Sequence, residues 1–122
     1  MTSNTEHSTL CFFNSSKDWG GGEKWHFEMA KRLHDSGYSV LICTYPHSEL
    51  YQKASVHSIP VHTFRITNYS FLNPFIRNSL KKFFVRNKVS HLILNLPSDL
   101  KCAGLSANQA DVKNIIYRRG SA

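Results

Sequence analysis

Apolar and polar residues alternate along the chain in blocks that predict strands and helices in turn. Five short apolar runs predict strands at Thr9 to Asn14, Tyr38 to Tyr45, Val61 to Ile66, His91 to Leu96 and Asn114 to Arg118. Most of these runs are continuous, which suits strands buried on both faces of a parallel sheet. The run from Val61 to Ile66 alternates more, so we expect it nearer an edge of the sheet.

Segments with helical periodicity separate the apolar runs. They predict helices over Glu23 to Ser36, Ser48 to Ser55, Pro74 to about Lys88, and Ser98 or Asp99 to about Gln109. Gly37 suits the end of the first helix, and Pro74 suits the start of the third. The resulting order β-α-β-α-β-α-β-α-β predicts an α/β fold. We expect a Rossmann-like, doubly wound parallel sheet of about five strands with helices on both faces.

The composition is that of a folded domain with a substantial core. Of the 122 residues, 41% are hydrophobic and 19% are charged. No apolar run approaches the roughly 20 residues of a transmembrane helix. The polar start MTSNTEHS lacks the pattern of a secretory signal, so we expect residues 1–8 to be a disordered tail and residues 9–122 to be the domain.

Charge and cysteine content bear on partners and compartment. The formal net charge of +7 favours negatively charged partners, such as nucleotide phosphates, an anionic membrane surface or nucleic acid. Three cysteines cannot all pair in disulfides, and no Cys or His lies at metal-ligand spacing from them. This pattern is typical of buried thiols in a reducing cytoplasm, so we predict a cytoplasmic protein without a metal site.

Three consecutive glycines stand between the first strand and the first helix, in the segment NSSKDWGGGEKWHFEMAKRL. Ligands of open parallel sheets bind outside the carboxyl ends of the strands, so this loop is expected to border the ligand crevice. Gly20, Gly21 and Gly22 allow close approach of the backbone, and Lys24 and the helix start attract phosphate. Glu23 does not suit a phosphate and is expected to brace the loop or the helix start.

The glycines do not match either common nucleotide-binding fingerprint. Trp25 stands where G-x-G-x-x-G requires its third glycine, and no P-loop pattern occurs. Taken alone, the triplet is equally compatible with a flexible turn whose helix begins with an acidic residue.

The stretch GGGEKWHFEMAKRLHDSGYSV closely resembles the first loop, helix and second strand of glycosyltransferase family 4 (group 1), retaining enzymes of the two-domain GT-B fold. The matching residues are Gly20, Gly21, Glu23, Ala30, Leu33, Gly37 and Val40. Strand spacing extends the likeness more loosely to Ala122. The resemblance implies the N-terminal, acceptor-side half of a GT-B enzyme, without its C-terminal donor domain. It also implies an enzyme that builds lipopolysaccharide or other cell-surface glycans.

The same resemblance implies an activity and its participants. Such an enzyme transfers a sugar, here of hexosyl type, from a nucleotide-sugar donor to a glycan or glycolipid acceptor, and needs no metal or other cofactor. Gly20, Gly21, Gly22, Glu23 and Lys24 would form the loop near the donor phosphates and the acceptor, where the leaving diphosphate develops negative charge. Because the donor lobe is missing, we expect these residues alone to be inactive.

Family members often carry histidines after the fourth and fifth strands, and this chain has Asn95 and Arg119 there. We therefore keep the catalytic residues as unknown, with Asn95, Asp99 and Arg119 as candidates. Arg119 could hold a phosphate or an acidic acceptor sugar, but it cannot act as a base near neutral pH. The acceptor class is accordingly expected to differ from that of histidine-bearing relatives.

The segment TNYSFLNPFIRNSLKKFFVRNK places basic residues beside aromatic ones. This suits peripheral contact with an anionic inner membrane leaflet, and the membrane-facing candidates are Arg77, Lys81, Lys82 and Arg86. The simpler alternative is an ordinary crossover helix that packs its apolar stripe on the sheet and keeps its lysines in water. That stripe would consist of Ile76, Leu80, Phe83 and Phe84.

Two other functions compete with sugar transfer. One is a stand-alone nucleotide-binding or regulatory α/β domain, whose unfolding transition a free nucleotide would raise. The other is a nucleic-acid-binding module that uses the basic helix. Because the chain has no recognised RNA or DNA motif and no aromatic platform on its strands, no nucleic acid partner is expected.

Overall fold

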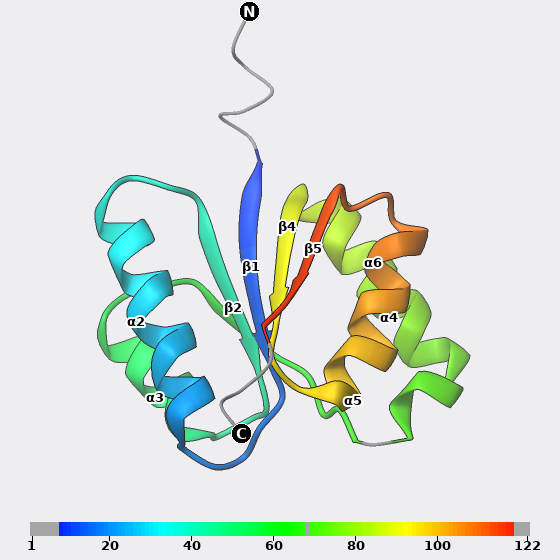
Figure 1. Ribbon diagram of the computed structural model, residues 1–122, viewed down its shortest axis with the longest axis horizontal. Helices are drawn as coiled ribbons and strands as arrows, with labels where there is room; N and C mark the ends of the chain where they lie inside the picture. The colour runs from blue at the N-terminus through cyan, green and yellow to red at the C-terminus, as the bar shows by residue number, and fades with distance from the viewer. Residues whose placement is uncertain (1–7, 68, 119–122) are drawn as a thin grey trace, which may run out of the picture.

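The chain folds around a five-stranded parallel sheet (Figure 1). The computed structural model describes residues 8–67 and 69–118. Its strands are β1 (Thr9–Asn14), β2 (Val40–Thr44), β3 (Val61–Thr63), β4 (Val89–Leu94) and β5 (Asn114–Tyr117). They are ordered β3-β2-β1-β4-β5, and neighbouring strands run parallel. The predicted Rossmann-like α/β fold is confirmed, and β3 is an edge strand as expected.

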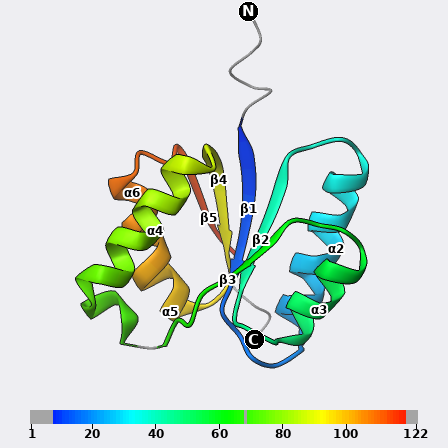
Figure 2. The same ribbon diagram turned by 180° about the vertical axis from the view of Figure 1, so that it is seen from behind.

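Helices cover both faces of the sheet (Figure 1, Figure 2). One face carries α2 (Gly21–Asp35) and α3 (Glu49–Val56). The other carries α4 (Pro74–Arg86), α5 (Pro97–Asp99) and α6 (Leu105–Gln109). A short 3-10 turn, η1 (Ser70–Leu72), precedes α4, and the π-helical turn η2 (Leu100–Gly104) joins α5 to α6. The last predicted helix is therefore present but interrupted.

Local sequence signals explain where the longer helices begin and end. Pro74 occupies the first turn of α4, and Asn73 caps it by accepting a hydrogen bond from the Phe75 amide at 2.9 Å. Ser48 caps α3 by accepting from the Tyr51 amide at 3.2 Å. Gly37 follows α2 with φ of +96°, a left-handed conformation that favours glycine. Each signal lies where the sequence analysis expected a helix boundary.

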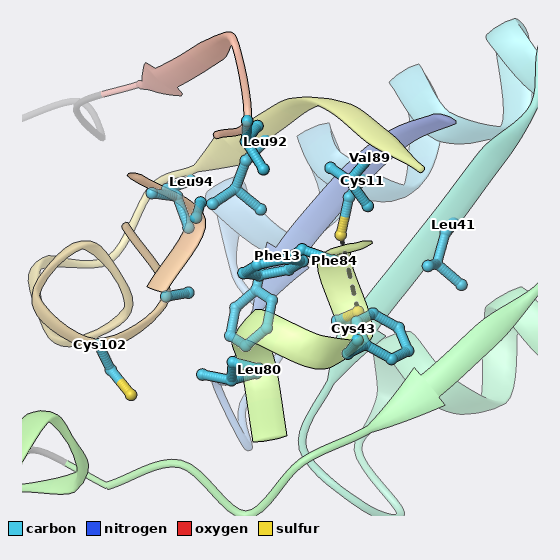
Figure 3. Packing of buried hydrophobic residues seen from close by; sticks show 14 of the residues in the cluster. Cys11, Phe13, Leu41, Cys43, Leu80, Phe84, Val89, Leu92, Leu94 and Cys102 are labelled. Atoms are coloured by element: carbon cyan, nitrogen blue, oxygen red, sulfur yellow. Dashed lines mark hydrogen bonds between the residues drawn. The ribbon is translucent and has the colours of Figure 1, made fainter. Parts of the chain in front are cut away.

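The core has two parts, one on each face of the sheet. Between the sheet and α2 and α3 lie Phe12, Ala30, Ile42, Leu50 and Ala54, all at most 2% exposed. The larger part, beneath α4 to α6, is shown in Figure 3 and includes Leu80, Phe83 and Phe84. With Ile76 packed against them, these residues form the predicted apolar stripe of α4. Their burial confirms that this stripe serves the core.

The three cysteines are buried and free. Cys102 lies in η2, whereas Cys11 and Cys43 come from neighbouring strands and place their sulfur atoms 3.7 Å apart (Figure 3). Desolvation raises the pKa of Cys102 to about 11 and that of Cys43 well above its ordinary value. The thiols of Cys43 and Cys102 are therefore protonated near neutral pH.

The strand order determines where a ligand crevice can lie. The chain winds through α2 and α3 on one face, then crosses after β3 to α4 on the other face and returns as β4 beside β1. The winding direction thus changes between β1 and β4, and in open α/β sheets the carboxyl ends at such a point border the binding crevice. The residues that follow Asn14 and Leu94 accordingly line the candidate site.

Some sequence predictions fall on residues outside the described part. These are the candidate Arg119 and the predicted tail apart from Ser8. Within residues 8–67 and 69–118, no helix combines the length and apolar character needed to cross a membrane.

Candidate functional site at the β1–β4 edge

The glycine loop lies at the carboxyl edge of the sheet. It begins after β1 ends at Asn14 and leads directly into α2, which starts at Gly21. Asn95 and Asp99 follow β4 at the same edge. The fold thus brings together candidates that are more than 70 residues apart in the sequence.

Asn14 is the centre of a buried hydrogen-bond network at this edge. Its side-chain nitrogen donates to a Glu23 carboxylate oxygen at 2.9 Å and to the Asn95 side-chain oxygen at 3.0 Å. Its own side-chain oxygen accepts from the Ser16 amide at 3.0 Å. Asn14 is fully buried, so it joins β1, α2 and β4 without reaching solvent. Asn14 was not predicted as a site residue, because its only signal in the sequence is that a polar residue ends an apolar run.

Glu23 braces the start of α2. One carboxylate oxygen accepts from the Gly20 amide at 2.9 Å, and the other accepts from Asn14. The side chain is buried, and a carboxylate in the first helical turn also interacts favourably with the helix dipole. Glu23 therefore holds the loop in place from the protein interior and does not face a ligand.

The three glycines have different surroundings. A Cβ atom on Gly22 would lie 1.9 Å from the Asn95 side-chain nitrogen, so the close approach of Asn95 requires glycine there. A Cβ atom on Gly20 would lie 3.3 Å from a Glu23 oxygen, whereas one on Gly21 would meet no atom of residues 8–67 and 69–118 within 4 Å. Gly21 thus opens to solvent in the first turn of α2, where amide groups have no partner within the helix. Lys24, in the same turn, is exposed.

Asp99 ties the glycine loop to α5. Its carboxylate accepts from the Ser15 amide at 2.8 Å and from the Ser15 hydroxyl at 2.5 Å. Burial raises the pKa of Asp99 to about 6; the Ser15 hydrogen bonds oppose this shift, and the nearby Glu23 carboxylate adds to it. Because Asp99 is fully buried and contacts Ser15, it can position the loop but does not face a ligand directly.

A cation and two aromatic rings lie beside this network. The Arg118 guanidinium carbon lies 4.4 Å from the centre of the Trp25 ring, and the Arg118 amide donates to Leu94 at 2.7 Å. His26 is fully buried between Phe12 and Trp25, and neither of its ring nitrogens has a hydrogen-bond partner among the residues that the structure describes. Burial, followed by the positive charge of Arg118, lowers the pKa of His26 to about 4, so the ring is neutral near neutral pH.

The basic residues of α4 differ in their exposure to solvent. Lys81, Lys82 and Arg86 are exposed, and with Asn78 and Val85 they line a shallow hollow of about 400 Å³. Arg77 is half-buried, and its Nε atom has no hydrogen-bond partner within the described part of the chain. Exposed apolar side chains precede or begin the helix, with Tyr69 75%, Leu72 65% and Phe75 82% accessible.

The fold of this chain has a counterpart among solved structures. It superposes on the crystal structure of Acinetobacter baumannii MurG with a TM-score of 0.71 and 14% sequence identity, over 90% of this chain and 34% of the MurG chain. The chain thus spans about one third of MurG, and the matched architecture is one half of a GT-B fold. No protein-family model matches the chain, and no curated protein matches it. The likeness therefore supports a GT-B N-terminal-like domain without singling out family 4.

Within residues 8–67 and 69–118, no group of three or more His, Cys, Asp or Glu side chains could hold a metal ion.

Proposed function

We propose that this chain is the acceptor-side half of a retaining glycosyltransferase that transfers a hexose from a nucleotide sugar to a glycan or glycolipid. The GT-B half-fold supports a glycosyltransferase-like domain. The retaining mechanism and a cell-surface glycan such as lipopolysaccharide as product are what the resemblance of the segment around Gly20 and Glu23 to family 4 implies. We propose that no metal or other cofactor takes part.

The observation that carries this proposal is the position of the α2 amino terminus. It lies at the carboxyl edge of the sheet, beside the ends of β1 and β4, with Gly21 open to solvent, Lys24 exposed and the loop braced by Glu23. In sugar transfer, the bond between the anomeric carbon and the donor phosphate breaks, and the diphosphate leaves with increased negative charge. Free amide groups and the Lys24 ammonium stabilise that charge without rearranging, because the buried network already holds the turn in place.

The buried network favours supporting roles for two of the catalytic candidates. Asn95 hydrogen-bonds to Asn14, and Asp99 hydrogen-bonds to Ser15, so each positions the loop that faces the donor. Arg119 remains a candidate for holding a phosphate or an acidic sugar. Arg118, stacked on Trp25, supplies a second cation at the end of β5. This arrangement supports phosphate binding more directly than proton transfer.

A matched pair of variants at Gly21 tests the proposal. Gly21→Asp adds a carboxylate in open space at the first helical turn, where a negative charge is compatible with folding. We expect the wild-type chain and Gly21→Ala to bind a nucleoside diphosphate in saturation-transfer NMR, and Gly21→Asp to lose binding through charge repulsion. Equal binding by all three proteins would refute a phosphate site at this turn.

Nucleotide affinity and sugar turnover distinguish the proposed half-enzyme from the alternative, a stand-alone nucleotide-binding or regulatory domain. The proposed half-site binds the nucleotide weakly, and we expect this chain alone to transfer no sugar because one Rossmann-like lobe leaves the donor open to water. Micromolar nucleotide binding with a raised melting temperature would favour the alternative. Detectable turnover on any nucleotide sugar would contradict the expected inactivity.

We further propose that the protein is cytoplasmic and contacts an anionic membrane leaflet through α4. Lys81, Lys82 and Arg86 point to solvent, and each cation near such a surface contributes about 1 kcal/mol. Tyr69, Leu72 and Phe75 add exposed apolar area at the start of the helix. Arg77 contributes less, because it is half-buried.

A further inference from the structure

A second hollow lies on the other side of the β1–α2 loop, along the solvent-facing side of α3. It encloses about 560 Å³ and is lined by Lys17, His47, Glu49, Gln52, Lys53 and His57, among others. Lys17 belongs to the loop between β1 and α2, which leads into the glycines of the proposed donor site. Its lining contains hydrogen-bond donors and acceptors, and the catalytic proposal uses none of them.

Cations outnumber carboxylates around this hollow. Lys17 is exposed, and no carboxylate lies within ion-pair distance of it among the residues that the structure describes. Its ammonium lies 4.8 Å from the centre of the Tyr45 ring, which Arg65 approaches to 5.8 Å. Glu49 pairs with Lys53 at 3.7 Å, but both side chains are well exposed, so the ion pair is weak. Another anion can therefore replace Glu49 beside Lys53.

Aromatic and polar groups beside the lysines suit a sugar ring. Trp19 is half-buried, with the Lys53 ammonium 5.1 Å from its ring centre, and the half-buried Tyr45 lies beside Lys17. The His57 Nδ1 atom lies 2.9 Å from the Lys53 carbonyl oxygen. In the tautomer that donates this bond, Nε2 is free to accept from a hydroxyl group. Trp19 and Tyr45 contact the two lysines but do not line the hollow among the described residues. Its lining offers the polar groups of His47, Gln52 and His57 to a ligand with several hydroxyl groups.

We infer that this hollow binds an acidic sugar, one that carries a carboxylate or a phosphate. Hydroxyl groups would pair with Gln52 and His57, and the anion would lie between Lys17 and Lys53. Calling this sugar part of the acceptor rests on the proposed function, since the hollow adjoins the donor loop. Binding of the sugar itself does not depend on that function.

Matched monosaccharides test the inference by amide NMR on the full chain. Galactose and galacturonate differ in a carboxylate, and galactose 6-phosphate tests the phosphate source. Each exposed cation that pairs with the anion contributes up to about fivefold in affinity. We therefore expect either anionic sugar to bind about tenfold more tightly than galactose at low salt, with shifts at Lys17, Gln52 and Lys53. The preference should shrink at 200 mM salt.

Variants identify the residues responsible. Lys17→Ala with Lys53→Ala should remove the preference for the anionic sugar, and Lys31→Ala on the outer side of α2 should keep it. Equal binding of galactose and both anionic sugars would overturn the inference. So would a preference that survives the double variant, or equally strong binding of inorganic phosphate, which would indicate a simple anion site.

A parallel titration with a nucleoside diphosphate separates this inference from the proposed function. Shifts at Gly21 and Gly22 without any sugar-induced shifts at Lys17 and Lys53 would overturn the acidic-sugar site and leave the donor site standing. The reverse result would support the acidic-sugar site and contradict the donor site.

Discussion

Substituting alanine at two adjacent glycines should have opposite effects on stability. A Cβ atom at Gly22 would lie 1.9 Å from the Asn95 side-chain nitrogen, which forces Asn95 away from Asn14. A Cβ atom at Gly21 would meet nothing within 4 Å. Both positions lie in the first turn of the same helix, so the two variants differ mainly in that contact.

The expected magnitudes follow from two contributions. Alanine in place of glycine favours a helix by up to about 1 kcal/mol at either position. At Gly22, displacing Asn95 breaks its buried hydrogen bond to Asn14, which costs about 1–3 kcal/mol. We therefore expect Gly22→Ala to lower the free energy of unfolding by about 1–2 kcal/mol, and Gly21→Ala to leave it unchanged or raise it slightly.

Urea unfolding followed by circular dichroism measures both variants, provided that the slope with denaturant stays constant. A double-mutant cycle with Asn95→Ala adds a sharper test, because the cost of Gly22→Ala should disappear once the Asn95 amide is removed. If Gly22→Ala is as stable as Gly21→Ala, or if its cost persists in the Asn95→Ala background, then the contact between Gly22 and Asn95 does not constrain the loop.

Three further predictions concern charge. The lowered pKa of His26, about 4, means that the unfolded chain binds its proton more readily, so His26 reduces stability by up to about 3 kcal/mol as the pH falls from 6.5 to 4. The raised pKa of Asp99, about 6, acts in the opposite direction, favouring the fold below pH 3.8 and losing that contribution as the pH rises through 6. Denaturant titrations should therefore show that, as the pH rises from 4 to 6, the free energy of unfolding falls in His26→Leu and rises in Asp99→Asn. The exposed His57→Gln serves as the control. Parallel profiles for His26→Leu and Asp99→Asn would contradict these assignments. Glu23→Gln should lower the free energy of unfolding by about 1–2 kcal/mol by weakening its bonds to Gly20 and Asn14, and an unchanged urea midpoint would show that the brace is unimportant. In liposome flotation with anionic lipid, Lys81→Glu with Lys82→Glu should abolish binding, whereas Lys31→Glu with Arg32→Glu on the opposite face should preserve it; equal binding by both would refute membrane contact through α4.

The strands and the boundaries of the long helices could be predicted because their signals are local. Continuous apolar runs mark strands buried on both faces, and Gly37 and Pro74 mark helix ends by their own backbone preferences. The edge strand β3 is shorter than expected: it ends at Thr63, and the Phe64 ring then stacks on Phe13 in the core. The π-helical turn in Leu100–Gly104 was not expected, because nothing in the apolar spacing distinguishes it from an α-helix.

The candidate site was only partly predictable, because its contacts join distant parts of the chain. The glycine loop and the start of α2 directly follow β1 in the sequence. Their place at the carboxyl edge of the sheet therefore follows from the order of strands and helices. Asn14 pairs with Asn95 across 81 positions, and Ser15 pairs with Asp99 across 84, and no local pattern encodes either pair. Glycine is likewise needed at residue 22 because of the Asn95 side chain, which follows β4.

The most direct test of the central claim is an amide-resolved NMR titration of this chain with a nucleoside diphosphate. The claim is that the first turn of α2, at the carboxyl ends of β1 and β4, binds the donor phosphates. We predict the largest shifts at Gly21, Gly22 and Lys24, and their loss in Gly21→Asp. Absence of shifts at these amides, or shifts confined to α3 or α4, would contradict the claim.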